Sequence, residues 1–188
     1  MRNWSKCLKC PAFYLLDDER KQRIERWEDR KERYVSRIKK LRLILVGESM
    51  PATRYFYDIN SDYETGGMRF NLQKEFDQME ISESQFLESF TRKGIILHDC
   101  ALCPIYLLVK KIRIAVAKEV TSYCFKTHNF DLIIKTPEIP IATIFPVGRG
   151  WLKKELPYEI RRRIVAEFSF SDLTGLKDLY LKIKNEGQ

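Results

Sequence analysis

The sequence lacks any long hydrophobic run. None of its apolar stretches approaches the roughly 20 residues that cross a bilayer, and MRNWSKCLKC at the start contains no apolar stretch of signal-peptide length. Internal repeats and low-complexity tracts are also missing. Hydrophobic residues make up 44% of the chain, enough for a real core, which argues against global disorder. We therefore expect a cytoplasmic protein with no membrane partner.

The 188 residues suit one domain, with little room for a second. We expect an N-terminal cysteine-containing segment and helix over 1–40, followed by an α/β core over 41–188. The net charge of +8 is uneven: residues 1–40 carry 13 Lys and Arg against 7 Asp and Glu, and residues 104–165 carry 12 against 5. Two basic regions that fold onto one face would attract a polyanion, whereas a solvated charged surface is the plainer interpretation.

Short apolar runs alternate with segments of helical periodicity. LRLILVG (41–47) predicts a strand buried on both faces, and we expect further strands at IILHDC (95–100), DLIIK (131–135) and IATIF (141–145). Helices are expected over 17–40, 70–80, 83–92 (capped by Ser82), 105–123, 156–168 and 171–184.

This alternation predicts a three-layer α/β fold, with a short parallel sheet of about four strands flanked by helices. Ligands of such sheets bind beyond the carboxyl ends of the strands. Three segments follow strands at that edge: a long loop over 48–69, HDCALCP (98–104) and PVGRG (146–150).

These three segments carry a family resemblance. LVGESMPATRYFY (45–57), GIILHDCAL (94–102) and IATIFPVGRG (141–150) resemble, in order and rough spacing, the three motifs of the uracil-DNA glycosylase superfamily. The resemblance implies a uracil-DNA glycosylase-like fold and a monomeric DNA-repair hydrolase without a nucleotide cofactor. Such an enzyme binds single- or double-stranded DNA, flips a damaged, deaminated base and hydrolyses its N-glycosidic bond.

By this resemblance Glu48 falls on the catalytic acid of the family's first motif. Cleavage of the bond builds positive charge on the sugar, which a carboxylate stabilises while orienting the attacking water. Phe56 and Tyr57 are the candidates for stacking on the flipped base, with Tyr55 as a competitor; alternatively, these rings fill the core beneath the loop.

The chain departs from the family at two positions. Asp99 stands where the family has a base-reading Asn, and an ionised carboxylate accepts hydrogen bonds but donates none. Either Asp99 is protonated or the preferred base differs from uracil; an exocyclic amino group would suit an ionised Asp99. Phe145 replaces a hydrogen-bond-donating His at the base-binding site, and losing such a donor typically costs about 10²–10³ in rate. His98, beside Asp99, would substitute only if both side chains pointed to one face of the strand.

Contacts to DNA phosphates are expected from the polar loops. Arg149 and the flexible Gly148 lie after the last motif, and Ser49 and Arg54 lie in the first loop. For each arginine, a surface ion pair is the alternative role.

Four of the five cysteines form two C-x-x-C pairs, and in a cytosolic chain this spacing favours a metal over disulfides. Some families of the superfamily hold an iron–sulfur cluster with an N-terminal C-x-x-C and two later cysteines. Cys7, Cys10 and Cys103 match three such positions, and a continuous helix over 105–123 would place Cys124 about 30 Å from Cys103. We therefore expect Cys100 as the fourth ligand of a [4Fe-4S] cluster or zinc; unligated thiols or disulfides are the alternatives.

Two other functions remain open from the sequence. The missing His and the Asn-to-Asp change favour a catalytically inactive nucleic-acid-binding module of the same fold. The third is an unrelated α/β protein that acts on a small nucleotide.

Overall fold

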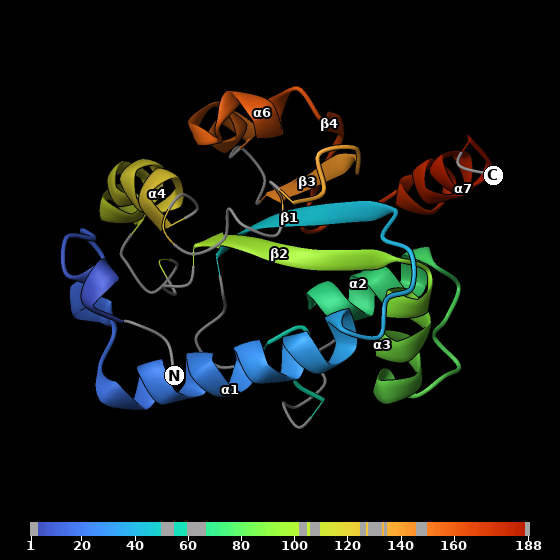
Figure 1. Ribbon diagram of the computed structural model, residues 1–188, viewed down its shortest axis with the longest axis horizontal. Coiled ribbons are helices and arrows are strands. Elements are labelled where there is room, and N and C mark those ends of the chain that lie inside the picture. The colour runs from blue at the N-terminus through green and yellow to red at the C-terminus, as the bar shows by residue number, and fades with distance from the viewer. Residues whose placement is uncertain are drawn as a thin grey trace.

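The structure is a computed structural model, and it describes residues 4–49, 55–59, 67–101, 105, 110–124, 127, 133, 135–145 and 150–186. Its centre is a four-stranded sheet in the order β2-β1-β3-β4, and every neighbouring pair of strands is parallel. Helices flank this sheet, which confirms the predicted three-layer α/β class (Figure 1).

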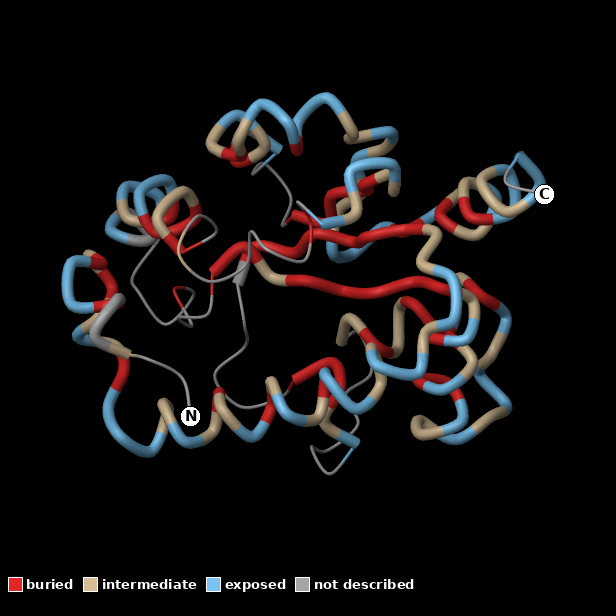
Figure 2. Tube along the Cα trace, in the orientation of Figure 1, coloured by how far each residue is buried: buried red, intermediate tan, exposed pale blue. Residues whose placement is uncertain are grey.

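The two strands β1 (Leu43–Ser49) and β2 (Ile95–Ala101) form the part of the sheet that carries the first two motifs. The side chains of Leu43–Val46 have no exposed surface, and neither do Ile95 and Ile96. Burial on both faces explains the continuous apolar runs. Figure 2 shows the same strands as a nearly continuous buried layer between partly exposed helices, and in β2 only Asp99 is of intermediate burial.

The third and fourth strands differ in part from expectation. β3 (Ile141–Phe145) confirms the strand at IATIF, but β4 (Ile164–Ser169) overlaps the end of the segment expected to be a basic helix over 156–168. The helix there, α6, covers only Tyr158–Arg161. The strand expected at 131–135 is wrong at its two described residues, because Ile133 is helical and Lys135 lies in a turn.

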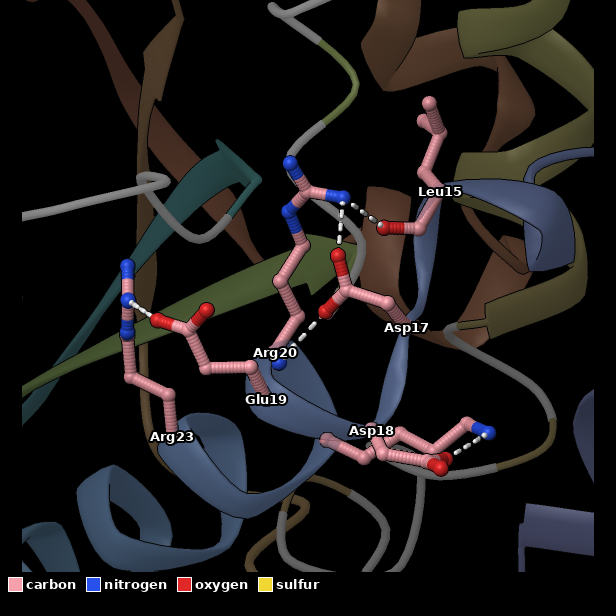
Figure 3. Close-up of polar contacts among 7 residues, drawn as sticks. Leu15, Asp17, Asp18, Glu19, Arg20 and Arg23 are labelled. Atoms are coloured by element: carbon pink, nitrogen blue, oxygen red, sulfur yellow. Dashed lines mark hydrogen bonds and ion pairs between the residues drawn. The ribbon is translucent and has the colours of Figure 1, made fainter.

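Helix α1 (Asp18–Val35) runs along one side of the sheet (Figure 1) and is shorter than the expected 17–40. Its N-cap is Asp17, whose Oδ1 accepts a hydrogen bond from the backbone N–H of Arg20 at 2.8 Å. The Arg20 guanidinium donates hydrogen bonds to Asp17 Oδ2 at 2.8 Å and to the Leu15 carbonyl at 3.1 Å (Figure 3). These bonds satisfy groups that a helix start leaves open, so α1 begins at a defined residue.

Helices α2 (Met68–Glu75) and α3 (Glu83–Arg92) connect β1 to β2 on the same side as α1 (Figure 1). The predicted cap of α3 is present as a reciprocal capping box between Ser82 and Gln85. Gly94 ends the connection with φ of +78°, and a Cβ there would lie 2.1 Å from the carbonyl oxygen of Lys40. Only glycine fits this entry into β2.

Helix α4 (Lys110–Cys124) lies on the other side of the sheet, near α6, and packs on β2 and on the 3₁₀ segment Gly150–Glu155 (Figure 1). Of the helix expected over 105–123, the described part is helical from Lys110, and residues 106–109 lie outside the described residues. The C-terminal helix α7 (Leu176–Glu186) begins five residues after the expected start. Among the helices that the structure describes, none combines the length and hydropathy needed to span a bilayer.

The strand order places a topological switch between β1 and β3. From β1 the chain moves outward to β2, returns to β3 on the other side of β1, and continues outward to β4. Crevices at the carboxyl ends of strands that flank such a switch are the usual ligand sites of open parallel sheets. Glu48 in β1 and Phe145 at the end of β3 therefore lie at the position where this fold class binds ligands.

Candidate functional site

The carboxyl ends of three strands bring the predicted motif residues into one row. Gly47 of β1 is paired in register with Asp99 of β2 on one side and with Ile144 of β3 on the other. Glu48 follows Gly47, and Phe145 follows Ile144. The parallel register thus gathers residues that are up to about a hundred positions apart in the chain.

Asp99 lies directly over Gly47. A Cβ built on Gly47 would stand 2.6 Å from Asp99 Oδ1 and 3.9 Å from the Cδ1 of Leu97. A separation of 2.6 Å is too short for a carbon–oxygen contact, so the carboxylate occupies the space that any side chain at position 47 would need. The glycine of the first motif and the acid of the second are therefore sterically coupled.

Glu48 and Asp99 lie on neighbouring strands, and the alternation of side chains puts them on opposite faces of the sheet, but they remain close enough to interact through their charges. The side chain of Glu48 is buried, with a relative exposure of 8%. The pKa of Asp99 is raised to about 7, chiefly by burial and to a smaller extent by the negative charges of Glu28 and Glu48, while the Lys31 ammonium opposes the shift. Two carboxyl groups whose ionisation depends on each other can divide acid and base roles between them.

Helix α1 supplies the charged neighbours that the sequence did not reveal. Lys31 is buried and donates a hydrogen bond to Nδ1 of His98 at 2.7 Å, and its Nζ lies 3.9 Å from Glu28. In the sequence Lys31 and Glu28 are two of many charges on an exposed-looking helix, and no motif marks them. Only the packing of α1 beneath β2 shows that they act on the strand ends.

His98 does not share the face of Asp99. Leu97 and Asp99 both approach Gly47, so the intervening His98 points to the opposite side of β2, where it meets Lys31. His98 therefore cannot act together with Asp99 as the substitute hydrogen-bond donor, as the alternation of side chains predicts.

The aromatic segment Tyr55–Asp58 forms a turn closed by a hydrogen bond from the Asp58 N–H to the Tyr55 carbonyl at 2.9 Å. The rings of Tyr55, Phe56 and Tyr57 are all buried, and Phe56 keeps the largest exposure at 6%. Phe56 packs at 5.3 Å between ring centroids on Phe90 of α3. All three rings are thus part of the core, and Phe56 is the one least enclosed.

Tyr57 ties this turn to β2. Its hydroxyl accepts a hydrogen bond from the Leu97 N–H at 2.8 Å and lies 3.3 Å from the Leu97 carbonyl, to which it donates. β2 is an edge strand, so these are backbone groups that no neighbouring strand satisfies. Burial raises the pKa of Tyr57, and the nearby Asp99 raises it as well. Tyr57 therefore lies beside Asp99 as a neutral hydrogen-bonding group.

The remaining predicted residues are distributed as follows. Phe145, the last residue of β3, is 2% exposed, and Ser49 is the last residue of β1. Arg54, Gly148, Arg149 and Cys103 lie outside the described residues.

The cysteines Cys7, Cys10, Cys100 and Cys124 are all buried. Cys10 N–H donates to the Cys7 carbonyl at 2.8 Å, so the first C-x-x-C pair lies on one turn of backbone. Burial raises the pKa of the Cys100 thiol, and Cys124 is close enough to raise it further. The sequence predicts a helix that carries Cys124 far from Cys103, and Cys103 lies outside the described residues. The helix that ends at Cys124, α4, packs on β2 and leaves Cys124 close enough to Cys100 to affect its thiol.

A metal site does not emerge from these cysteines alone. Within the described part of the chain, no group of three or more His, Cys, Asp or Glu side chains is arranged to hold a metal ion. The predicted set of Cys7, Cys10, Cys100 and Cys103 needs a residue that lies outside the described part, so it stays a prediction.

The fold and site define a class: a three-layer α/β protein with two acids near the carboxyl ends of β1 and β2 and a buried aromatic turn hydrogen-bonded to β2. Comparisons with protein-family models, curated proteins and solved structures give no significant match to this chain. The site itself therefore carries the functional argument.

Proposed function

We propose that the protein is a DNA glycosylase of the uracil-DNA glycosylase type, which hydrolyses the N-glycosidic bond of a flipped, deaminated base. The observation that carries this proposal is the row formed by Glu48, Gly47 and Asp99 at the carboxyl ends of β1 and β2. The resemblance of the three motifs places the catalytic acid and the base reader at these same positions.

Glu48 is the catalytic residue in this proposal. As the base leaves, positive charge develops on the deoxyribose, and a nearby carboxylate stabilises that charge and orients the attacking water. The burial of Glu48 supports this role, because a charge acts more strongly where water is scarce. The bond between the sugar carbon and the base nitrogen breaks, and the base leaves with the bonding electrons. A new bond forms from that carbon to the water oxygen, and the proton that the water loses balances the negative charge of the departing base.

Asp99 reads the edge of the base. Its carboxyl group is held against Gly47 at a strand end, which gives it a fixed position rather than a mobile one. When protonated it donates one hydrogen bond and accepts another, as the amide of an Asn does, which matches a base with adjacent N–H and C=O groups. When ionised it accepts only, which favours an exocyclic amino group.

DNA is the partner in this proposal. The net charge of +8 favours a polyanion, and backbone contacts from basic residues would make binding dependent on salt. Ser49, Arg54, Gly148 and Arg149 are the residues proposed to contact phosphates around the flipped nucleotide, by their place in the resembling motifs.

The test is cleavage of single-lesion oligonucleotides that carry uracil, hypoxanthine or another damaged base, with enzyme in stoichiometric amount. We expect an abasic site, revealed by alkaline strand scission, for at least one lesion. The absence of abasic product from every lesion would refute the proposed glycosylase activity.

A second function is favoured by one specific observation. Phe145 ends β3 as a buried ring without a hydrogen-bond donor, at the position where the resembling family has a donating His. An inactive DNA-binding module of this fold would bind with a strong salt dependence and without turnover, and its binding would survive Glu48→Ala. Weak binding that does not change with salt would instead indicate a small nucleotide as ligand.

A cysteine-bound iron–sulfur cluster or zinc remains part of the proposal. A site built from Cys7, Cys10, Cys100 and Cys103 would brace the segment behind Asp99, and four thiolates suit either zinc or iron–sulfur. Metal analysis of anaerobically purified protein tests it, and the set is wrong if neither iron nor zinc copurifies in stoichiometric amount or if Cys100→Ser retains the metal fully.

A further inference from the structure

Arg69 of α2 makes an unusual set of contacts with the aromatic turn Tyr55–Asp58. Its guanidinium donates to the carbonyl of Tyr55 at 2.9 Å, of Phe56 at 3.1 Å and of Asp58 at 2.9 Å. The side chain is almost fully buried, with a relative exposure of 9%, and it forms an ion pair with Glu83 of α3. One buried cation thus holds three of the four carbonyls in the turn.

The turn is also held by α1. Trp27 Nε1 donates to Asp58 Oδ2 at 2.9 Å, Arg30 forms an ion pair with the same carboxylate, and the Trp27 ring stacks on Tyr55 at 5.2 Å. Side chains of both α1 and α2 therefore hold the turn in place.

Arg69 acts on the backbone rather than on any one ring. Hydrogen bonds to carbonyl oxygens set the path of the chain, and the rings of Phe56 and Tyr57 follow that path. Tyr57 in turn bonds to both backbone groups of Leu97, two residues before Asp99. A continuous series of contacts therefore joins Glu83, Arg69, the aromatic turn and the tip of β2.

We propose that Arg69 is a positioning residue for base recognition: it holds the buried aromatic turn against β2, so that Tyr57 keeps Leu97, and with it Asp99, in place to read the flipped base. This inference rests on the proposed glycosylase function and adds to it the residue that preorganises the base site. Arg69 touches neither base nor sugar in this role.

The planar fork of arginine is needed for these contacts. Its several N–H groups reach different carbonyls at once, whereas a lysine ammonium on a flexible stem is a compact point charge. Arg69→Lys keeps the charge that balances Glu83 but removes the fork. Its expected effect is a loosened turn rather than an unfolded protein.

The chain offers a matched control in Arg163. Its guanidinium also donates to backbone carbonyls, those of Ile133 at 2.7 Å, Thr136 at 2.6 Å and Ile139 at 2.6–2.9 Å. Arg163 directly precedes β4, so it lies at the amino end of the parallel sheet, opposite to the proposed site. Arg163→Lys therefore removes the same kind of contact from the other end of the sheet.

The experiment compares binding of two DNA probes by the full-length wild type, Arg69→Lys and Arg163→Lys. One probe carries 2′-fluorinated deoxyuridine or deoxyinosine, whose glycosidic bond resists cleavage, and the other carries a tetrahydrofuran abasic analogue. The ratio of the two dissociation constants isolates the contribution of the base from that of the phosphates. We expect Arg69→Lys to reduce this ratio by about tenfold, with the affinity for abasic DNA unchanged and with no reduction in Arg163→Lys.

The outcomes separate this inference from the function on which it rests. If the wild type prefers neither base-bearing probe over abasic DNA, the base-binding function fails and the role of Arg69 fails with it. If the wild type shows the preference and Arg69→Lys keeps it, or if Arg163→Lys loses it equally, only the role of Arg69 is refuted. Should Arg69→Lys not fold, the double variant Arg69→Gln with Glu83→Gln, which removes both charges of the pair together, carries the same comparison.

Discussion

The carboxylate of Asp99 fills the space above Gly47, where a Cβ would lie 2.6 Å from Asp99 Oδ1. This contact joins the first and second motifs across the β1–β2 pair. It also explains in physical terms why a glycine precedes Glu48: the strand needs no special backbone angle there, but the neighbouring acid needs the room.

Gly47→Ala should therefore displace the Asp99 carboxylate while leaving the strand paired. We expect single-turnover base excision to fall by about 10–100-fold, because a shift of about 1 Å in a positioning group can cost that much. The control is Gly175→Ala, where φ of +87° imposes strain but no atom lies within 4 Å of the new methyl. Equal losses of activity in both variants would show that stability, not the contact with Asp99, is responsible.

Tyr57→Phe removes the hydroxyl that satisfies both backbone groups of Leu97 at the edge of the sheet. We expect the free energy of unfolding to drop by about 1–3 kcal/mol, because two buried polar groups lose their partner. Urea denaturation measures this change, and Tyr14→Phe, at a tyrosine with 67% exposure, is the control. A drop no larger than that of the control would contradict the role of this hydroxyl.

The raised pKa of Asp99 gives the folded protein a defined pH dependence. Folding raises the pKa of this acid from 3.8 to about 7, so between these values the folded state binds more protons than the unfolded state. Stability therefore falls as pH rises through this window and levels off above it. Asp99→Asn removes the titrating group, so the stability of the wild type relative to the variant should decrease by roughly 2 kcal/mol from pH 5 to pH 8. A difference independent of pH in urea titrations would show that burial does not raise this pKa.

The cap of α3 provides a test that is independent of function. Ser82 accepts from the Gln85 N–H, and the Gln85 side chain accepts from the Ser82 N–H. Ser82→Ala should cost about 1 kcal/mol in thermal or urea unfolding without altering any DNA affinity. A change in DNA affinity would mean that α3 contributes to the binding site more directly than its place in the fold indicates.

Patterns of burial made most of the sheet predictable from sequence. The apolar runs of β1, β2 and β3 are long enough, and sufficiently bounded by glycine and proline, to identify strands buried on both faces. The sequence does not indicate β4, because Ile164–Ser169 is half exposed and follows Arg161–Arg163, so its short apolar run merges with a basic helical pattern. The segment at 131–135 shows the converse error, since a short apolar run does not distinguish a strand from a buried helical turn.

The site was predictable where it depends on strand ends and unpredictable where it depends on helix packing. Parallel register brings Gly47 beside Asp99, and the motif order indicates this. By contrast, Lys31 is an ordinary charge of a predicted helix, and Arg69 falls in the loop expected over 48–69, whereas the structure places it in α2. Only tertiary packing buries them against His98 and the aromatic turn. The burial of all three aromatic rings likewise follows from the contacts of α1 and α3, which a single sequence does not reveal.

Glu48 is the residue on which the account depends most directly, and the decisive measurement is the single-turnover rate of base release by wild type and Glu48→Gln on the most rapidly cleaved lesion. We predict that Glu48→Gln lowers the rate by about 10²–10³-fold with DNA affinity preserved. Glu159→Gln, at an exposed position of α6, should match the wild type. A wild type that releases no base, or a Glu48→Gln variant as fast as the wild type, would contradict the proposed catalytic role.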